Sequence, residues 1–244
     1  MCYNSSITLT NENIMINTKY DYKQLKRKNV NGKRHYIIDG VEMQPVPSVT
    51  TVLSATTPKE DTEGLNKWRR KVGYAKANAI CSESANRGTR VHNYLEKYIL
   101  TGTFPTPGSN PYAKHANNMA KVVKDQGLKN MTEYWGTEVP LLFPKLYGGT
   151  TDLCGVHGGE EAIVDFKQSN KVKKREWIDG YFIQTVMYGK AHDEMYGTKI
   201  KKGVIMMITP DLEYQEFVLE GKEYERIEQV MWKRLEQYYE LWIR

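Results

Sequence analysis

In the first half of the chain, apolar residues recur every three to four positions, which is the spacing of one helix face. From about Thr62 this pattern predicts a first helix with its apolar positions on one side. Those positions are Leu65, Trp68, Val72, Ala75, Ala79 and Ile80. A second helix is expected over residues 83–100 and a third over residues 112–126, where Gly127 is a natural stop.

After the third helix the pattern changes to the alternating and continuous apolar runs that are typical of strands. Strands are predicted over residues 132–143, 145–154 and 160–168, with a turn over Gly155–Gly159 that makes the last two an antiparallel hairpin. A helix is expected over residues 178–195, and short strands over residues 204–208 and 214–219. An amphipathic helix should run from Gly221 to the C-terminus.

This order of elements predicts the α/β fold class, with a mixed central β-sheet flanked by helices and an N-terminal helical region. We expect three parts. Residues 1–46 form a polar tail and small hairpins at Asn31-Gly32 and Asp39-Gly40. Residues 47–130 form the helical region, where Ser48 or Ser54 is placed to cap a helix, and residues 131–244 form the core.

Composition narrows the function only slightly. The 244 residues carry 35 Lys and Arg against 29 Asp and Glu, and the net charge of +6 permits a polyanionic partner without demanding one. The three cysteines form no CxxC pair, so we expect no structural zinc, no iron–sulfur cluster and no disulfide framework. A reducing, cytoplasmic location follows as an expectation, because no secretory signal or membrane-spanning apolar run is apparent either.

The most informative residues lie on the predicted hairpin. Asp165 and Lys167 are two apart, so they share one face of their strand, while Phe166 points to the other face. Asp152 lies on the neighbouring strand. Adjacent carboxylates repel each other unless a cation sits between them, and their hard oxygens suit Mg²⁺ or Mn²⁺. A lone Asp-x-Lys triplet is common on surface strands, but the preceding Asp at hairpin spacing favours a metal-dependent site with a lysine beside it.

Other polar residues, before and after this group in the sequence, are spaced so that they share a helix face or lie on a neighbouring strand. His92 and Glu96 are four apart on a predicted helix, as are Gln184 and Tyr188, so each pair shares a helix face. Glu138 lies on the strand before Asp152. Basic residues follow Lys167 in one short loop and also occupy the first helix, where they would form a phosphate-binding rim. These residues are Arg69, Arg70, Lys171, Lys173, Lys174 and Arg175.

Taken in order, these motifs resemble the PD-(D/E)XK nucleases of the RecB-like branch, and especially the phage-encoded and mitochondrial genome maintenance exonucleases. The motifs are Gly88-Thr89-x-x-His92, Glu138, Gly149-x-x-Asp152, Asp165-x-Lys167 and Gln184-x-x-x-Tyr188. Upstream, the Pro47–Leu53 segment and the Trp68…Gly73…Asn78 helix are also similar to the phage pattern. The resemblance covers roughly residues 47–188 and departs from the pattern at Gln168, where Thr is common.

The resemblance implies a restriction-endonuclease-like core and a role for each site residue. Asp152, Asp165, the Phe166 carbonyl and His92 would hold Mg²⁺ or Mn²⁺. Lys167 would be the catalytic lysine, and Glu138 would assist at the metal. Gln184 and Tyr188 would hold the active-site strand and the nucleic-acid backbone. The N-terminal helices would form an arch that admits single strands.

Three hypotheses remain open on the sequence. The first is a metal-dependent DNA exonuclease that prefers single-stranded ends and acts in DNA processing, recombination or repair, in the bacterial host cytoplasm if it is phage-encoded. The second is an endonuclease of the same fold that acts on branched or flapped DNA. The third is a non-catalytic nucleic-acid-binding protein that uses basic, Tyr and Trp side chains.

Overall fold

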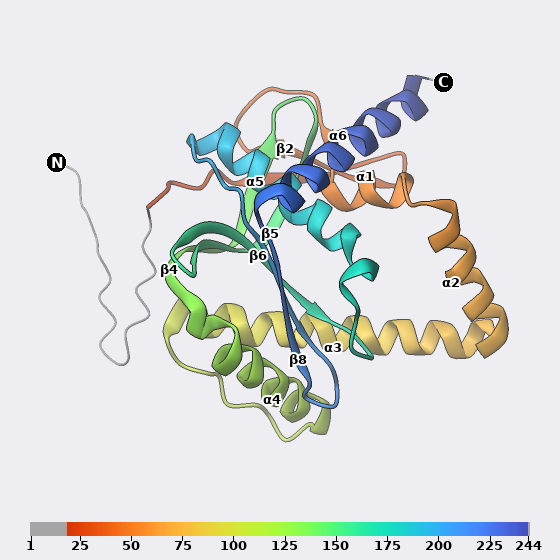
Figure 1. The fold of residues 1–244 in the computed structure, drawn as a ribbon, viewed down its shortest axis with the longest axis vertical. Coiled ribbons are helices and arrows are strands. Elements are labelled where there is room, and N and C mark those ends of the chain that lie inside the picture. Colours follow the sequence, from red (N-terminus) through yellow and green to blue (C-terminus); the bar gives the residue numbers. More distant parts are fainter. Residues whose placement is uncertain (1–18, 244) are drawn as a thin grey trace.

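A five-stranded mixed sheet with helices on both faces forms the centre of the structure (Figure 1). The computed structural model describes residues 19–243, so the tail expected over residues 1–18 lies outside the described part. The strand order is β4-β5-β6-β7-β8, and only β6 and β7 run parallel. The α/β fold class predicted from the sequence is therefore confirmed, and this arrangement is consistent with a restriction-endonuclease-like core.

The first half of the described chain contains β1 (Leu25–Val30), β2 (Lys33–Ile38), β3 (Val46–Pro47), α1 (Val49–Ala55), α2 (Lys59–Val72), α3 (Tyr74–Thr101), α4 (Pro111–Gln126) and the short helix η1 (Leu128–Asn130). The second half contains β4 (Met131–Phe143), β5 (Tyr147–His157), β6 (Glu160–Gln168), the short helix η2 (Arg175–Trp177), α5 (Asp179–Tyr196), β7 (Gly203–Ile208), β8 (Tyr214–Leu219) and α6 (Gly221–Ile243).

Two hydrophobic layers hold the helices against the sheet. Alternate residues of β6 point to opposite faces, so Ile163 packs with α5 and α6 while Val164 packs with α3 and α4. The crossover through α5 is what allows β6 and β7 to lie parallel. Because both faces are covered, β7 is buried at all six positions and appears in the sequence as a continuous apolar run.

The N-terminal segment packs beside β5. Strands β1, β2 and β3 form a small separate sheet, and Ser48 forms an isolated parallel bridge with Gly148. The Ser48 hydroxyl accepts a hydrogen bond from the Thr51 N–H at 3.0 Å, so Ser48 is the N-cap of α1. Helix α2, in contrast, has no buried residue and extends away from the sheet before the chain turns into α3 (Figure 1).

The structure corrects two predicted boundaries. The first two predicted helices divide at Gly73, whose φ of 91° breaks the helix, and α3 then runs without interruption past Arg87 and Gly88. Gly155 lies within β5 rather than in the turn, which is formed at Gly158 and Gly159. None of the described helices is both long and apolar enough to span a bilayer.

Candidate metal centre and nucleic-acid interface

Two carboxylates face each other across β4 and β5. Glu138 and Asp152 occupy opposite positions, because the residues on either side of them pair across the two strands. The backbone of Glu138 has a φ of 50°, in the left-handed region that costs a non-glycine residue about 1 kcal/mol or more. This strained position directs one carboxylate toward another, which does not favour the stability of the fold. The pair is therefore a candidate functional site.

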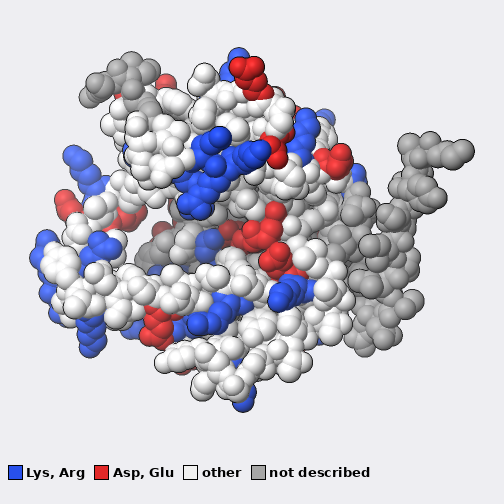
Figure 2. Space-filling model, turned by 180° about the vertical axis from the view of Figure 1, so that it is seen from behind, with Lys and Arg blue, Asp and Glu red and all other residues white. Residues whose placement is uncertain are grey.

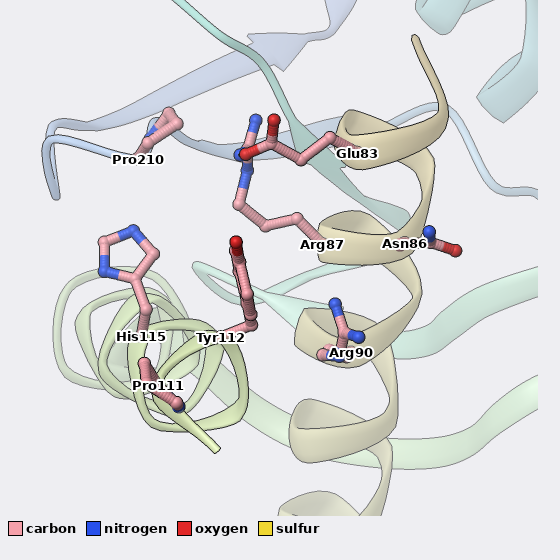
Figure 3. A pocket seen from close by; sticks show the side chains of 8 residues that line it. All are labelled: Glu83, Asn86, Arg87, Arg90, Pro111, Tyr112, His115 and Pro210. Carbon is pink, nitrogen blue, oxygen red and sulfur yellow. The ribbon is translucent and has the colours of Figure 1, made fainter. Parts of the chain in front are cut away.

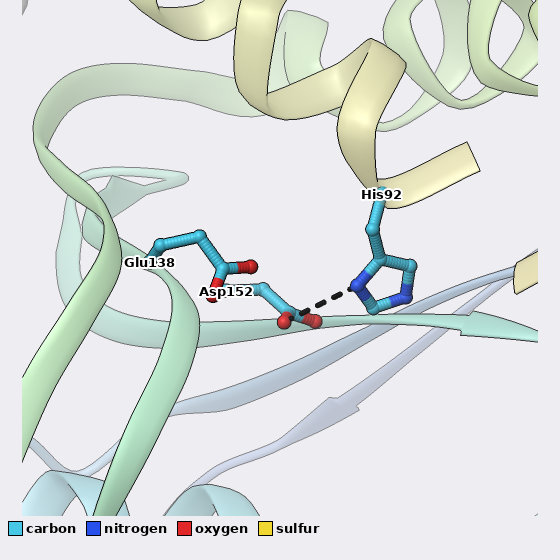
Figure 4. A group of neighbouring side chains, drawn as sticks. All are labelled: His92, Glu138 and Asp152. Carbon is cyan, nitrogen blue, oxygen red and sulfur yellow. Dashed lines mark ion pairs between the residues drawn. The ribbon is translucent and has the colours of Figure 1, made fainter. Parts of the chain in front are cut away.

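His92 completes a group of three potential metal ligands. It projects from α3 toward the two carboxylates, and its Nδ1 lies 3.4 Å from Asp152 Oδ1 (Figure 4). One ligand atom from each of His92, Glu138 and Asp152 lies within 4.8 Å of the other two. The long helix α3 thus brings a nitrogen donor to two oxygens that the sheet has already placed together.

The end of β6 supplies the other predicted residues. Backbone pairing between β5 and β6 stops at Leu153 and Val164, and beyond that point Asp152 Oδ2 accepts the Phe166 N–H at 2.7 Å. The side chain of Asp152 therefore replaces a backbone acceptor and is fixed in position. Asp165 is 1% exposed and forms an ion pair with Lys167.

The faces of β6 are as the sequence predicts. Asp165 and Lys167 share one face, while Phe166 packs on the other, where its ring lies 6.0 Å from the His92 ring. The Lys167 ammonium also lies 5.2 Å from the centre of the Tyr181 ring. A lysine held by a carboxylate and an aromatic ring has a restricted position, which suits a group that must meet one atom of a substrate.

Two carboxyl groups of the site are destabilised in their charged form. Partial burial, together with the negative charges of Asp152 and Glu96, raises the pKa of Glu138 to about 7. Burial and the Asp152 charge raise the pKa of Asp165 to about 6, even though the Lys167 ammonium opposes the shift. Both groups are therefore easier to protonate than ordinary carboxyls, as expected where carboxyl groups are withdrawn from water and lie close to another carboxylate.

The remaining charges of the site are mutually stabilised. Burial disfavours the charged form of Asp152, but His92 and Lys167 outweigh it and lower the pKa of this carboxyl. Burial likewise opposes the charge on His92 and on Lys167, and the nearby carboxylates raise the pKa of both. Asp152 is thus the most firmly ionised carboxylate of the group.

This donor set fits a hard divalent cation. Two ligands on opposite sides of Mg²⁺, each about 2.1 Å from it, lie about 4.2 Å apart, which is close to the 4.8 Å limit of the three-residue group. Carboxylate oxygens suit Mg²⁺ and Mn²⁺, and an imidazole nitrogen is compatible with Mn²⁺. Asp165 lies outside this group, beside Lys167. Its role as a ligand, and that of the Phe166 carbonyl, stay predictions.

Gln184 and Tyr188 lie on α5, beneath the strand that carries Asp152. The Tyr188 side chain is 3% exposed, and a Cβ added to Gly149 would lie only 2.7 Å from its hydroxyl oxygen. Gln184 interacts with that hydroxyl. The glycine therefore allows Tyr188 to support β5 three residues from Asp152. A direct contact of either residue with nucleic acid stays a prediction.

The predicted basic residues are not equally free to bind phosphate. Arg175 is bound to Asp179 at 2.6 Å and to Glu223 at 3.0 Å, so its charge is largely offset. Lys171 and Lys174 are exposed on the loop after β6, and Arg70 is exposed on α2. Lys173 and Arg69 are partly buried. On the face drawn in Figure 2, acidic side chains gather at the centre, with basic side chains above and below them.

Three residues near the site were not predicted to act there. Glu96 contributes charge at Glu138, and its spacing of four from His92 was the available signal. Tyr181 lies against Lys167, and Asn170 accepts hydrogen bonds from Ser84 at 3.0 Å and from Arg87. No pattern in the sequence distinguishes Tyr181 or Asn170, because both contacts depend on the way in which separate elements pack.

Comparisons with known proteins find solved structures of low sequence identity to this chain. No protein-family model and no curated protein sequence matches the chain. One similar solved structure is titled "Putative exonuclease" and comes from Eubacterium rectale, with 16% identity, a TM-score of 0.41, and coverage of 64% of this chain and 68% of that chain. Another is an alkaline exonuclease from Laribacter hongkongensis, with 14% identity, a TM-score of 0.24, and coverage of 63% and 82% respectively.

Proposed function

We propose that this protein is a Mg²⁺- or Mn²⁺-dependent DNA exonuclease that prefers single-stranded ends and serves DNA processing, recombination or repair. The observation that carries the proposal is the convergence of His92, Glu138 and Asp152 within 4.8 Å, beside the buried pair of Asp165 and Lys167. A non-catalytic binding protein gains nothing from carboxylates that face phosphate, so this group favours catalysis over binding alone.

Each residue has a distinct task in this proposal. Asp152, Glu138 and His92 would hold the cation, and Asp165 would add negative charge beside them. When bound, the cation supplies Lewis-acid stabilisation of the negative charge that develops on the attacked phosphate. Lys167 donates hydrogen bonds on the same side and orients the attacking water or the phosphate oxygen. The Phe166 N–H holds the Asp152 side chain in position through its bond to Oδ2, which leaves Oδ1 on the side of His92.

The preference for single strands rests on the shape of the N-terminal helical region. Helix α2 buries no residue, carries Arg69, Arg70 and Lys71 in its last turn, and stands away from the sheet. The space-filling view shows an opening between the side of the molecule that α2 forms, at the left, and the main body (Figure 2). A polar, solvent-bridging helix lined with positive charge suits passage of one flexible phosphate backbone better than docking of a rigid duplex.

End-labelled DNA tests this function. Single strands, duplexes and closed circles labelled at the 5′ or 3′ end are incubated with Mg²⁺ or Mn²⁺ and resolved on gels. We expect progressive shortening of linear single strands and no cleavage of circles, whereas rapid cleavage of circles would favour an endonuclease. Lys167→Ala and Asp152→Asn should each reduce the rate at least about hundredfold. Lys129→Ala, at an exposed lysine of η1, is the matched control and should leave the rate unchanged.

A further inference from the structure

A pocket lies on the far side of α3 from the metal centre. It has a volume of about 640 Å³, within the usual range for small-molecule sites, and lies between α3, the start of α4 and the turn after β7 (Figure 3). The residues that line it include Glu83, Arg87, Arg90, Tyr112, His115 and Pro210. Arg87 and His92 are five residues apart, so they lie about 140° apart around the helix. The pocket is therefore separate from the metal centre.

Two arginines give the pocket positive charge that is only partly offset. Among residues 19–243, the Arg90 side chain has no ion-pair or hydrogen-bond partner. Arg87 is paired with Glu83 at 3.2 Å, but its Nε is buried and lacks a hydrogen-bond partner in the described structure. A guanidinium without a partner, beside a second arginine that has one carboxylate partner, favours binding of an anion, and arginine matches the geometry of phosphate.

The opposite wall is mostly apolar. Tyr112 is 64% exposed in the first turn of α4, and its hydroxyl points toward the Arg87 side of the pocket (Figure 3). The His115 ring, one turn later, and Pro210 form the rest of this wall. Tyrosine and imidazole rings offer stacking surfaces to an aromatic ligand. The N-terminal end of α4 adds a partial positive charge at the same wall.

The pocket is also connected to the catalytic strand. Arg87 and Ser84 both donate to the side-chain oxygen of Asn170, which lies three residues after Lys167. This contact ties the rear of α3 to the chain that leaves β6. A ligand on Arg87 therefore lies near the segment that follows Lys167 along the chain.

We propose that this pocket binds one nucleotide unit, with the base against Tyr112 and His115 and the phosphate on Arg90 and Arg87. The unit is either a residue of a DNA strand or a free nucleoside monophosphate, since both offer an aromatic base joined to a phosphate. The strand version rests on the proposed nuclease function, whereas the free-nucleotide version does not. In both versions the pocket is a second binding site that leaves the metal centre intact.

Two binding probes distinguish these sources. The first is deoxyadenosine monophosphate, titrated by calorimetry into the metal-free full chain. The second is a set of fluorescent single strands of increasing length, measured by anisotropy with Ca²⁺ at several salt concentrations. The variants are Arg90→Gln and Tyr112→Ala. The control is Lys121→Gln, which removes the same charge from the opposite side of α4, at an exposed position away from the pocket.

We expect Tyr112→Ala to weaken binding of at least one probe between about fivefold and a hundredfold, because a stacking surface is lost. Arg90→Gln should reduce the slope of log affinity against log salt by about 0.7 for a strand, as one phosphate contact is lost. Weaker binding of the DNA strands by the variants would show that the pocket binds a residue of the DNA substrate. Weaker binding of the monophosphate alone would show that it binds a free nucleotide.

If both variants bound both probes with the affinity of the wild type, the proposal that this pocket binds a nucleotide would be wrong. If that result came with normal degradation of DNA by the wild-type chain, the proposed nuclease function would stand without it. If the wild-type chain failed to degrade DNA with either metal, the proposed nuclease function would be wrong. The monophosphate titration alone would then decide whether the pocket binds a nucleotide.

Discussion

His192 should make the folded protein progressively less stable as the pH falls from about 6.5 to about 4. The side chain is fully buried on α5, with its Nε2 3.1 Å from the Tyr22 hydroxyl and its Nδ1 2.8 Å from the Thr198 hydroxyl. Burial, together with the nearby Lys19 charge, lowers its pKa from 6.5 to about 4. The folded protein therefore holds this imidazole in its neutral form.

The sign and size of the effect follow from proton linkage. Between the two pKa values the unfolded chain binds a proton at His192 and the folded chain does not, so acid favours unfolding. With a pKa of 6.5 unfolded and about 4 folded, the free energy of unfolding falls by about 2 kcal/mol at pH 5 and about 3 kcal/mol at pH 4, relative to pH 8. Above pH 6.5 the contribution of His192 is fully present.

Urea unfolding between pH 8 and pH 4 measures this effect. Trp135 is a built-in fluorescence reporter, because it is buried with its ring 5.9 Å from the His192 ring. His192→Gln keeps a polar, neutral side chain at the position and removes the titration. The variant should be less stable than the wild type at pH 8, but the difference should shrink as the pH falls. Parallel stability curves for the two proteins between pH 7 and pH 5 would refute the reasoning.

Three further predictions concern the metal centre and two glycines. Glu138→Gln should raise the midpoint of thermal unfolding of the metal-free protein, because carboxylate repulsion is relieved, and should weaken Mn²⁺ binding at least about tenfold in calorimetry. The affinity of the wild type for Mn²⁺ should rise between about pH 5 and pH 8, because protons must leave Asp165 and Glu138 as the cation binds. The pKa is about 6 for Asp165 and about 7 for Glu138. An affinity that does not change with pH would contradict this. Gly155→Ala should destabilise the fold by roughly 1–3 kcal/mol in urea unfolding, because its Cβ would lie 2.1 Å from the Glu133 carbonyl oxygen. Gly64→Ala, in open space on α2, should instead stabilise it by up to about 1 kcal/mol, and a shift of the same sign for both would refute the packing argument.

The order of helices and strands could be predicted from the sequence because it depends on local periodicity. The alternation around Asp165 and Lys167 fixed their common face, and the apolar run at residues 204–208 predicted a strand. The boundary at Gly73 was missed, since apolar spacing continues across it and only the backbone conformation breaks the helix.

The candidate metal centre depends on contacts that a local sequence pattern does not contain. Spacing alone placed Asp152 near Asp165, but the strand register set Glu138 opposite Asp152, and the path of α3 brought His92 to both. The pocket behind α3 likewise depends on how α4 and the turn after β7 pack against that helix. The sequence by itself thus determined which residues form each face, because neighbours along the chain set periodicity. Only the tertiary structure decided which faces meet, because those contacts join residues that are far apart in the chain.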